Sequence, residues 1–313
     1  MKRRINNKII PPCMIGTWAW GKGMNGSRMV FGKSYSEEQL IRTFNKACSL
    51  GFTMWDTAEV YGMGKSEKVL GKCLKENSDV IISTKYLPDK KYKSNALTNS
   101  MNKSFERLEV NSIDLYWLHQ PYALKENLVE MTECLKSGKI KGIGLSNCSL
   151  SEIKEAEKIL GKSGFRLTAV QNHYSLLSVK RQEEIIIYCN ENNIIFFGYM
   201  VLEQGALSGH YNEKNPFPIC SMRGISFGKK KFKKIKPLLD YQKALAEKYN
   251  VDTSQIPIAW AISKGVVPII GLTRPEYAIS LSKGIEIKLS SDEIKKLELF
   301  AKDSKVICKG SWE

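Results

Sequence analysis

Four side chains that can hold or move a proton stand at comparable places in this sequence. Asp56, Lys85 and His119 each end a short apolar segment, and Tyr61 follows Asp56 by five residues. A lysine cation beside a tyrosine stabilises the phenolate, lowers the pKa of the phenol from about 10 and allows it to act as a general acid near neutral pH. A buried Asp56 would be the counter-ion of Lys85, and His119 would orient or polarise a carbonyl oxygen. Together the four residues predict a proton-donating site.

Each of these residues also has a purely structural interpretation. Asp56 and Lys85 could form a buried ion pair, Tyr61 could be a core aromatic residue, and His119 could be a hydrogen-bonded buried histidine. The choice depends on whether the fold brings all four side chains to one place.

A short motif near Tyr61 resembles the end of a phosphate-binding P-loop. Residues 64–66 read GKS, but Glu59 stands where a P-loop needs a glycine, and its carboxylate would repel phosphate. We therefore expect Ser66 to be the N-cap of a helix that carries Glu67 in its first turn.

A second motif, GKGMNG at residues 21–26, matches the fingerprint of dinucleotide-binding folds. That fingerprint needs a helix directly after its last glycine, because the helix N-terminus binds the pyrophosphate. We expect the next helix only near Ser36, so these glycines predict a flexible loop.

Apolar segments and segments with helical periodicity alternate along the chain. Most of the apolar segments are continuous, as expected for parallel strands buried on both faces. Several helical segments begin with a capping residue such as Ser36 or Ser151 and end near a glycine. The expected strands are 13–17, 52–56, 79–85, 113–119, 140–146, 167–172, 194–199 and 266–271, and the clearest helices are 36–50, 66–76, 95–108, 126–138 and 151–160.

This alternation predicts an α/β fold, a (β/α)8 TIM barrel formed by residues 1–313 as one domain, with a doubly wound sheet as the alternative. Polar or aromatic residues end the expected strands, which is typical of the C-terminal mouth of a barrel, where active sites lie. Two long segments, 203–235 and 304–313, are candidate lids over this mouth. The strand-terminal residues are Thr17, Asp56, Lys85, His119, Ser146, Asn147, Gln171, Asn172, Tyr199 and Gly271.

The chain carries a formal net charge of +16, which raises nucleic acid or a membrane surface as partners. Most of the excess is scattered lysine. The one dense run, GKKKFKKIK at 228–236, is expected to be a solvated basic loop, with contact to a phosphate or an acidic partner as the alternative. Aromatic residues do not alternate with basic ones as in single-strand binders, and no apolar run is long enough for a transmembrane helix. We therefore expect neither a nucleic acid nor a membrane as partner.

The cysteines and histidines indicate neither disulfides nor a metal site. The eight cysteines lie far apart without a Cys-x-x-Cys pair, and the three histidines lack zinc-binding spacing. Without a signal peptide at the basic N-terminus, these thiols predict a protein of the cytoplasm.

The motifs together resemble the aldo-keto reductase family along nearly the whole chain. The segments that carry the resemblance occur in the family's order: GFTMWDTAEVYGMGKSEKVLG, SIDLYWLHQP, GKIKGIGLSN, AVQNHYSLL, GYMVLEQGALSG and VVPIIG. The resemblance implies that Asp56, Tyr61, Lys85 and His119 form the catalytic tetrad, with Tyr61 as the acid. It also implies an NADPH-dependent oxidoreductase that reduces the carbonyl of an aldehyde or ketone and needs no metal.

The same resemblance implies a cofactor groove for NADPH, with NADH as the alternative. Ser146, Asn147 and Gln171 would hold the nicotinamide carboxamide, and the ring of Tyr199 would stack on the nicotinamide. The rest of the groove would be formed by Thr17, Trp18, Asp56, Leu202, Gly205, Leu207, Gly271, Thr273, Arg274 and Tyr277.

The chain departs from the family's pattern in two places. Arg274 could bind the 2′-phosphate, but Tyr277, Ser280 and Leu281 occupy positions where the family has Arg or Gln, Glu and Asn. The segment before Cys13 is short, so the hairpin that closes the barrel floor is expected to be minimal or absent.

A small-molecule carbonyl substrate would lie against Trp18, Tyr61 and His119. Further pocket walls are expected from Trp20, Tyr86, Leu87 and Trp312, and Gln120 suggests a polar pocket. The alternative function is that of a cofactor-bearing regulatory subunit of a membrane channel, which some relatives of this fold are. The sequence leaves open whether the protein is a monomer or a homo-oligomer.

Overall fold

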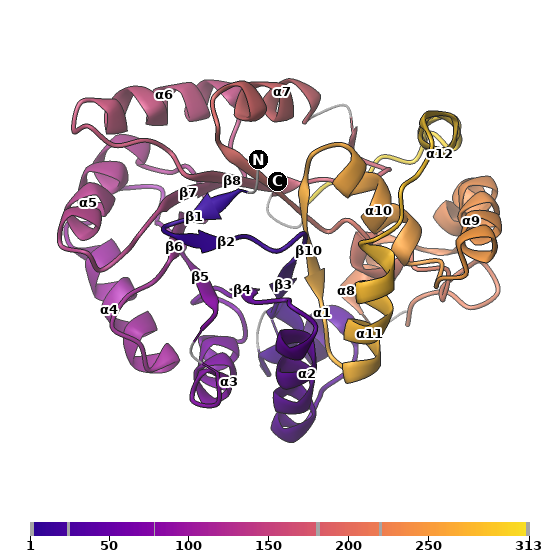
Figure 1. Cartoon of the computed structure of the whole chain (residues 1–313), viewed down its shortest axis with the longest axis horizontal. Coiled ribbons are helices and arrows are strands. Elements are labelled where there is room, and N and C mark those ends of the chain that lie inside the picture. Colours follow the sequence, from indigo (N-terminus) through magenta and orange to yellow (C-terminus); the bar gives the residue numbers. More distant parts are fainter. Residues whose placement is uncertain (1–2, 24–25, 78, 180–181, 219–220, 311–313) are drawn as a thin grey trace.

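Eight parallel strands close into a barrel in the computed structural model, which describes residues 3–23, 26–77, 79–179, 182–218 and 221–310. Seven of them follow one another around the barrel in chain order, and β10 closes it by pairing with both β3 and β9 (Figure 1). The predicted (β/α)8 TIM barrel is confirmed, and the doubly wound sheet is wrong. The strands are β3 (Met14–Gly16), β4 (Met54–Asp56), β5 (Ile81–Tyr86), β6 (Leu115–Leu118), β7 (Ile143–Ser146), β8 (Ala169–His173), β9 (Ile195–Tyr199) and β10 (Val267–Gly271).

Helices surround the barrel and cover the outer faces of its strands (Figure 1). The helices of this layer are α2 (Glu37–Ser49), α3 (Lys65–Leu74), α4 (Ala96–Leu108), α5 (Leu124–Lys136), α6 (Leu150–Gly161), α7 (Glu183–Glu191), α10 (Gln255–Ser263) and α11 (Pro275–Gly284). Both faces of the strands are therefore largely buried, which explains why most of the strand segments are continuous apolar runs.

The barrel interior is filled by inward side chains, and a short hairpin closes its N-terminal end. The hairpin, β1 (Arg4–Ile5) and β2 (Lys8–Ile9), is present in minimal form. Ile5 and Ile10 pack against interior residues of the strands. The interior cluster also contains Met14, Met54, Ile81, Leu115, Trp117, Ala169, Ile195, Phe197 and Val267.

Two expected helix starts are wrong. Helix α3 begins at Lys65 after Gly64, whose φ of 81° is left-handed, and Ser66 instead donates its hydroxyl hydrogen bond to Thr17. Helix α6 is capped by Ser149 in a capping box with Glu152, and not by Ser151. In both cases the observed N-cap lies two residues before the expected one, at Gly64 and at Ser149.

The glycine-rich motif at 21–26 leads directly into a helix, contrary to expectation. Helix α1 (Ser27–Phe31) has Gly26 as its N-cap. It is only five residues long and follows the short 3-10 helix η1 (Trp18–Trp20) rather than a strand. The motif therefore lacks the strand–turn–helix context of a dinucleotide-binding fingerprint.

The described part of the long segment after β9 contains three helical pieces. It contains η3 (Glu203–Gly205), α8 (Met222–Ser226) and the first turns of α9 (Lys229–Tyr249). The basic run at 228–236 thus belongs to a helix, and its prediction as a loop is wrong. After α12 (Ser291–Asp303), the described part of the tail packs inward, with Val306 and Cys308 buried; Trp312 lies outside the described residues.

None of the helices in the described ranges combines the length and apolar character that crossing a bilayer requires. The same ranges hold no group of three or more His, Cys, Asp or Glu side chains arranged to bind a metal ion.

Candidate active site

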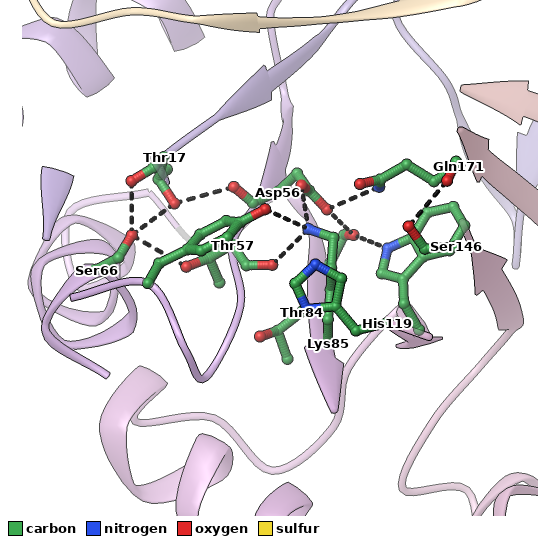
Figure 2. A network of polar contacts seen from close by, with 12 residues as sticks. Thr17, Asp56, Thr57, Ser66, Thr84, Lys85, His119, Ser146 and Gln171 are labelled. Carbon is green, nitrogen blue, oxygen red and sulfur yellow. Dashed lines mark hydrogen bonds and ion pairs between the residues drawn. The ribbon is translucent and has the colours of Figure 1, made fainter. Parts of the chain in front are cut away.

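The four predicted proton-handling residues meet at the C-terminal end of the barrel. Asp56 is the last residue of β4, Lys85 lies near the end of β5, His119 follows β6, and Tyr61 lies on the loop after β4. Figure 2 shows Asp56, Lys85 and His119 converging from neighbouring strands. The fold therefore brings together residues that are 63 positions apart at most (56 to 119).

Lys85 is the centre of this group. Its side chain is fully buried, and its ammonium donates hydrogen bonds to Asp56 Oδ2, to the Thr57 carbonyl oxygen at 2.8 Å and to Tyr61 Oη at 3.5 Å (Figure 2). Burial lowers the pKa of Lys85, and the Asp56 carboxylate opposes that shift. Asp56 thus compensates a cation that would otherwise be costly to bury.

Tyr61 is held between aromatic neighbours. Its ring stacks on Trp18 at 5.9 Å between centroids and meets the His119 ring edge-on at 6.1 Å. The pKa of Tyr61 is raised well above 10, first by burial and then by the charges of Asp56 and Tyr199. The expectation of a lowered pKa for Tyr61 is wrong, because burial of the phenol raises it. Tyr61 therefore keeps its proton at neutral pH.

His119 is neutral at the same pH. Burial lowers its pKa well below 6.5, and the Lys85 charge adds to the shift. A neutral imidazole can hydrogen-bond a carbonyl oxygen without adding a second cation to the site.

The loop that carries Tyr61 is positioned by a close contact between two glycines. A Cβ on Gly21 would lie 2.8 Å from the Tyr61 carbonyl oxygen, and a Cβ on Gly62 would lie 2.7 Å from Gly21 Cα. Gly62 also has a φ of 58°, which other residues adopt rarely. Any side chain at these positions would separate the two loops and displace Tyr61.

A second polar group lies beside the tetrad, at the ends of β7, β8 and β9. Asn147 donates to the His119 carbonyl oxygen at 2.8 Å and accepts a hydrogen bond from Tyr199 Oη at 2.7 Å. Ser146 donates to the Gln171 carbonyl oxygen at 2.8 Å, and Gln171 Nε2 lies 3.4 Å from Asp56 Oδ1. The residues predicted to hold a carboxamide are therefore adjacent to one another and to the tetrad.

A cavity of about 670 Å³ opens over both groups. It extends from the tetrad past the ends of β9 and β10 to the starts of α10 and α11. The predicted residues that line it are Trp18, Asp56, Tyr61, His119, Ser146, Asn147, Gln171, Tyr199, Leu202, Gly205, Gly271, Thr273 and Tyr277.

The other predicted site residues lie outside the cavity wall. Thr17 is buried behind Asp56, to whose carbonyl oxygen it donates at 2.9 Å, and Leu207 is in the core. Arg274 is exposed, Tyr86 is buried, and Trp20 donates its indole hydrogen bond to the Leu272 carbonyl oxygen at 2.7 Å. Lys85 reaches the site only through Asp56 and Tyr61.

Sequence reasoning missed most of the wall opposite the barrel. These residues come from the end of α1 and the loop that follows it, from the segment after β9, and from the start of α10. Only the segment after β9 was predicted to lie over the mouth, without naming its side chains. They are Phe31, Lys33, Tyr35, Gln204, Ser208, His210, Tyr211, Arg223 and 252–255.

Arg223 connects the segments that form this wall. The residue is buried, with a relative exposure of 7%. Its guanidinium donates hydrogen bonds to the carbonyl oxygens of Gln204 and Phe31 and to Tyr211 Oη, each at 3.0 Å. Its guanidinium also lies 4.6 Å from the Phe217 ring centroid. Arg223 therefore joins α1, α8 and the segment after β9 around the cavity.

Comparison with known proteins decides the family. The sequence model of the aldo/keto reductase family matches residues 12–302. This chain belongs to the aldo/keto reductase family. The family is one of oxidoreductases, so the resemblance seen in the sequence is confirmed.

Individual relatives agree with this assignment. An uncharacterized oxidoreductase of Mycobacterium tuberculosis is 32% identical over 88% of this chain and 85% of its own length. An aldo-keto reductase of Schizosaccharomyces pombe, whose name specifies NADP(+), is 28% identical over 97% of this chain and 92% of its own. The structure of a glycerol dehydrogenase from Gluconobacter oxydans matches 99% of this chain and 98% of its own with a TM-score of 0.82; at 23% identity this shows the shared fold.

Proposed function

We propose that this protein reduces the carbonyl group of a small aldehyde or ketone with NADPH, and that Tyr61 donates the proton. One observation carries the proposal: a buried Lys85 ammonium lies between the Asp56 carboxylate and the Tyr61 hydroxyl at the floor of the cavity. A buried ion pair alone needs no tyrosine beside it and no opening to a cavity. The arrangement is what proton donation to a bound carbonyl requires.

The chain's own residues would divide the work as follows. Tyr61 holds a proton on Oη and passes it to the carbonyl oxygen as negative charge develops there. Lys85 stabilises the phenolate that remains, and Asp56 keeps Lys85 charged and oriented. Neutral His119 would fix the carbonyl oxygen by a hydrogen bond. The nicotinamide, when bound, would supply the hydride.

The cavity fits such a cofactor. Its volume is in the range of cofactor pockets, and it places amide and hydroxyl side chains beside the tetrad. Ser146, Asn147 and Gln171 would bind the carboxamide, and Tyr199 would stack on the ring. Trp18, Leu202, Gly205 and Gly271 would line the groove, with Thr17 and Leu207 supporting it from behind.

NADPH is proposed over NADH because the name of the S. pombe relative specifies NADP(+). Thr273 and Tyr277 line the distant end of the cavity, and Arg274, exposed at the N-cap of α11, would have to reach over that end to bind a 2′-phosphate. Direct comparison of the two cofactors is therefore part of the test.

The substrate would lie against Trp18, Tyr61 and His119, which share one end of the cavity. Trp20 and Tyr86, which do not line the cavity, would at most support its walls. We further propose that the protein works in the cytoplasm, since the seven cysteines of the described ranges are unbonded, as reducing compartments keep them.

The test is a panel of aldehydes and ketones with NADPH, followed by absorbance of the reduced cofactor and repeated with NADH. We expect turnover with at least one carbonyl class and its loss in Tyr61→Phe. Tight NADPH binding without turnover of any carbonyl would instead favour the alternative, a cofactor-bearing regulatory subunit.

A further inference from the structure

We propose that Trp117 and Ser83 form, with Asp56, an interior relay that fixes the orientation of the Asp56 carboxylate beneath Lys85 and Tyr61. Ser83 and Trp117 are positioning residues in this proposal, since they act on the reaction only through Asp56. The inference rests on the proposed function, because its consequence is measured on carbonyl reduction.

The hydrogen bonds of the relay run in one direction. Trp117 Nε1 donates to Ser83 Oγ at 2.5 Å, and Ser83 Oγ donates to Asp56 Oδ1 at 2.7 Å. An indole N–H can only donate, and an ionised carboxylate can only accept. The single hydroxyl hydrogen of Ser83 is therefore directed to Asp56, and the indole occupies an acceptor position of the same hydroxyl.

Ser83 and Lys85 bind different oxygens of the Asp56 carboxylate. Lys85 binds Asp56 Oδ2, and Ser83 binds Oδ1. Gln171 Nε2 also faces Oδ1 but at 3.4 Å, and its amide is proposed to serve the cofactor. Ser83 is thus the close donor that keeps the carboxylate from rotating away from Lys85.

Packing alone does not explain a serine at this place. Ser83 lies on β5 between the inward residues Ile81 and Lys85, and both Ser83 and Trp117 are fully buried. Trp117 belongs to a cluster of buried apolar residues in the barrel interior, with Met54 and Leu115 among its members. A hydroxyl in such surroundings is costly unless it is hydrogen-bonded, so its place here reflects the bonds it makes.

Trp117 packs against its neighbours on β7 and β9. A Cβ on Gly144 would lie 2.1 Å from Trp117 Cε3, so β7 leaves room for the indole only because residue 144 is glycine. Phe197 meets the indole edge-on, with 5.7 Å between ring centroids. The indole is therefore held in the position from which its N–H reaches Ser83.

The first experiment compares Ser83→Ala with Thr84→Val. Thr84 is a matched control, because it is the next residue on β5, is equally buried and donates outward to Glu67 Oε1 at 2.6 Å. We expect Ser83→Ala to lower kcat by about tenfold or more, the usual effect of losing a hydrogen bond to a charged group. KM and the Kd for NADPH should change less than about twofold, and Thr84→Val should keep the wild-type kcat.

The second experiment tests the connection through Trp117. Trp117→Phe keeps an aromatic ring and removes the N–H, so kcat should fall by less than in Ser83→Ala. In the double variant the two losses should not multiply, because Trp117 acts through the Ser83 hydroxyl. Losses that multiply would mean two independent packing effects and would overturn the relay, as would wild-type kcat in Ser83→Ala.

A measurement on the wild-type protein separates the relay from the activity. With tryptophan labelled by ¹⁵N, the indole N–H of Trp117, assigned by its absence in Trp117→Phe, should exchange slowly with solvent and shift in Ser83→Ala. An unshifted Trp117 signal in Ser83→Ala would overturn the hydrogen bond. If no carbonyl is reduced by wild-type protein, the proposed function fails, while this measurement still tests the geometry.

Discussion

Burial raises the pKa of Tyr61 and lowers the pKa of His119. Both side chains are therefore uncharged near neutral pH. In contrast, Lys85 and Asp56 form a pair whose charges compensate each other. The site thus combines a phenol that keeps its proton with one fixed cation beside it. The predictions for single residues follow from this division.

Tyr61→Phe should reduce carbonyl turnover by about 10²–10⁴-fold, the usual contribution of a positioned acid. NADPH binding should change little, because in the proposed mechanism the hydroxyl would contact the carbonyl and not the cofactor. Quenching of tryptophan fluorescence by NADPH measures this binding. Tyr86→Phe is the control, since Tyr86 is a neighbouring buried tyrosine outside the cavity wall. Normal turnover in Tyr61→Phe would remove this residue from the mechanism.

Lys85→Met should abolish turnover and also destabilise the fold. The substitution leaves Asp56 as a buried carboxylate without its cation, which costs on the order of 3–5 kcal/mol. Urea unfolding measures the loss. Lys72→Met is the control, because Lys72 forms an exposed pair with Glu37 and should change stability by less than about 1 kcal/mol. An unfolding midpoint equal to wild type in Lys85→Met would contradict a buried pair.

His119 should make the protein less stable in mild acid. Its pKa is about 6.5 when unfolded and lower when folded, so below that pH the unfolded chain binds a proton that the folded chain does not. The contribution is fully present above about pH 6.5 and is lost as the pH falls through the lowered folded value. Urea unfolding between pH 7.5 and 5 should therefore show a steeper loss in wild type than in His119→Asn; equal slopes would contradict the shift.

The barrel strands could be predicted from sequence because most of the expected segments are continuous apolar runs that end at a polar or aromatic residue. The tetrad could be predicted for the same reason, since it occupies those strand ends and the loop after β4. The role of Ser66 could not be predicted, because its hydroxyl donates a hydrogen bond to Thr17, which is 49 residues away in the sequence. The cavity wall around Arg223 was also out of reach, because it depends on how α1 and α8 meet and not on a local pattern.

The loop after β9 contains residues with a strained backbone. Met200, Glu203 and Gln204 have φ values of 56°, 47° and 53°, a conformation that such residues rarely adopt. Buried Glu203 anchors the loop, since it accepts a hydrogen bond from Ser175 and lies 2.8 Å from His173 Nε2. Loops held in this way occur where a ligand needs a preformed surface.

Glu203→Ala should therefore weaken NADPH binding by about tenfold or more, as expected when hydrogen bonds to a buried charge are lost, with a smaller effect on kcat. The loop lines the cavity through Leu202, Gln204 and Gly205, so releasing it should affect the cofactor before the carbonyl. Titration of tryptophan fluorescence with NADPH measures the Kd. Glu213→Ala, in the same segment but outside the cavity wall, is the control. An unchanged Kd in Glu203→Ala would show that the loop holds its shape without the anchor.

Most of the protein's excess positive charge is scattered, but its one dense basic run, residues 228–236, follows closely on a helix that forms part of the cavity wall. Helix α9 lies at the periphery of the barrel (Figure 1), and its first turn contains three lysines and no acidic residue. It begins three residues after α8, which carries Arg223 into the cavity wall. Lysines at a helix N-terminus are disfavoured by the helix dipole, so this placement has a small cost in stability.

We expect these lysines to speed the approach of NADPH without contacting the carbonyl. Several cations near a cavity raise the local concentration of an anionic ligand, an effect that salt screens over about 10 Å at 0.1 M. Replacement of five of them by Gln should slow NADPH association at low salt and flatten its salt dependence, with kcat unchanged. The residues to replace are Lys229, Lys230, Lys231, Lys233 and Lys234.

The control variant removes the same charge from the far side of the barrel, around α5 and α6 (Figure 1). It replaces exposed lysines that lie on or next to these helices, namely Lys139, Lys141, Lys154, Lys158 and Lys162. Stopped-flow quenching of tryptophan fluorescence by NADPH, at low and at high salt, compares both variants with wild type. If net charge alone attracts the cofactor, the two variants should slow association equally. A loss confined to the α9 variant requires the attraction to act locally, because only there are the cations next to the cavity wall.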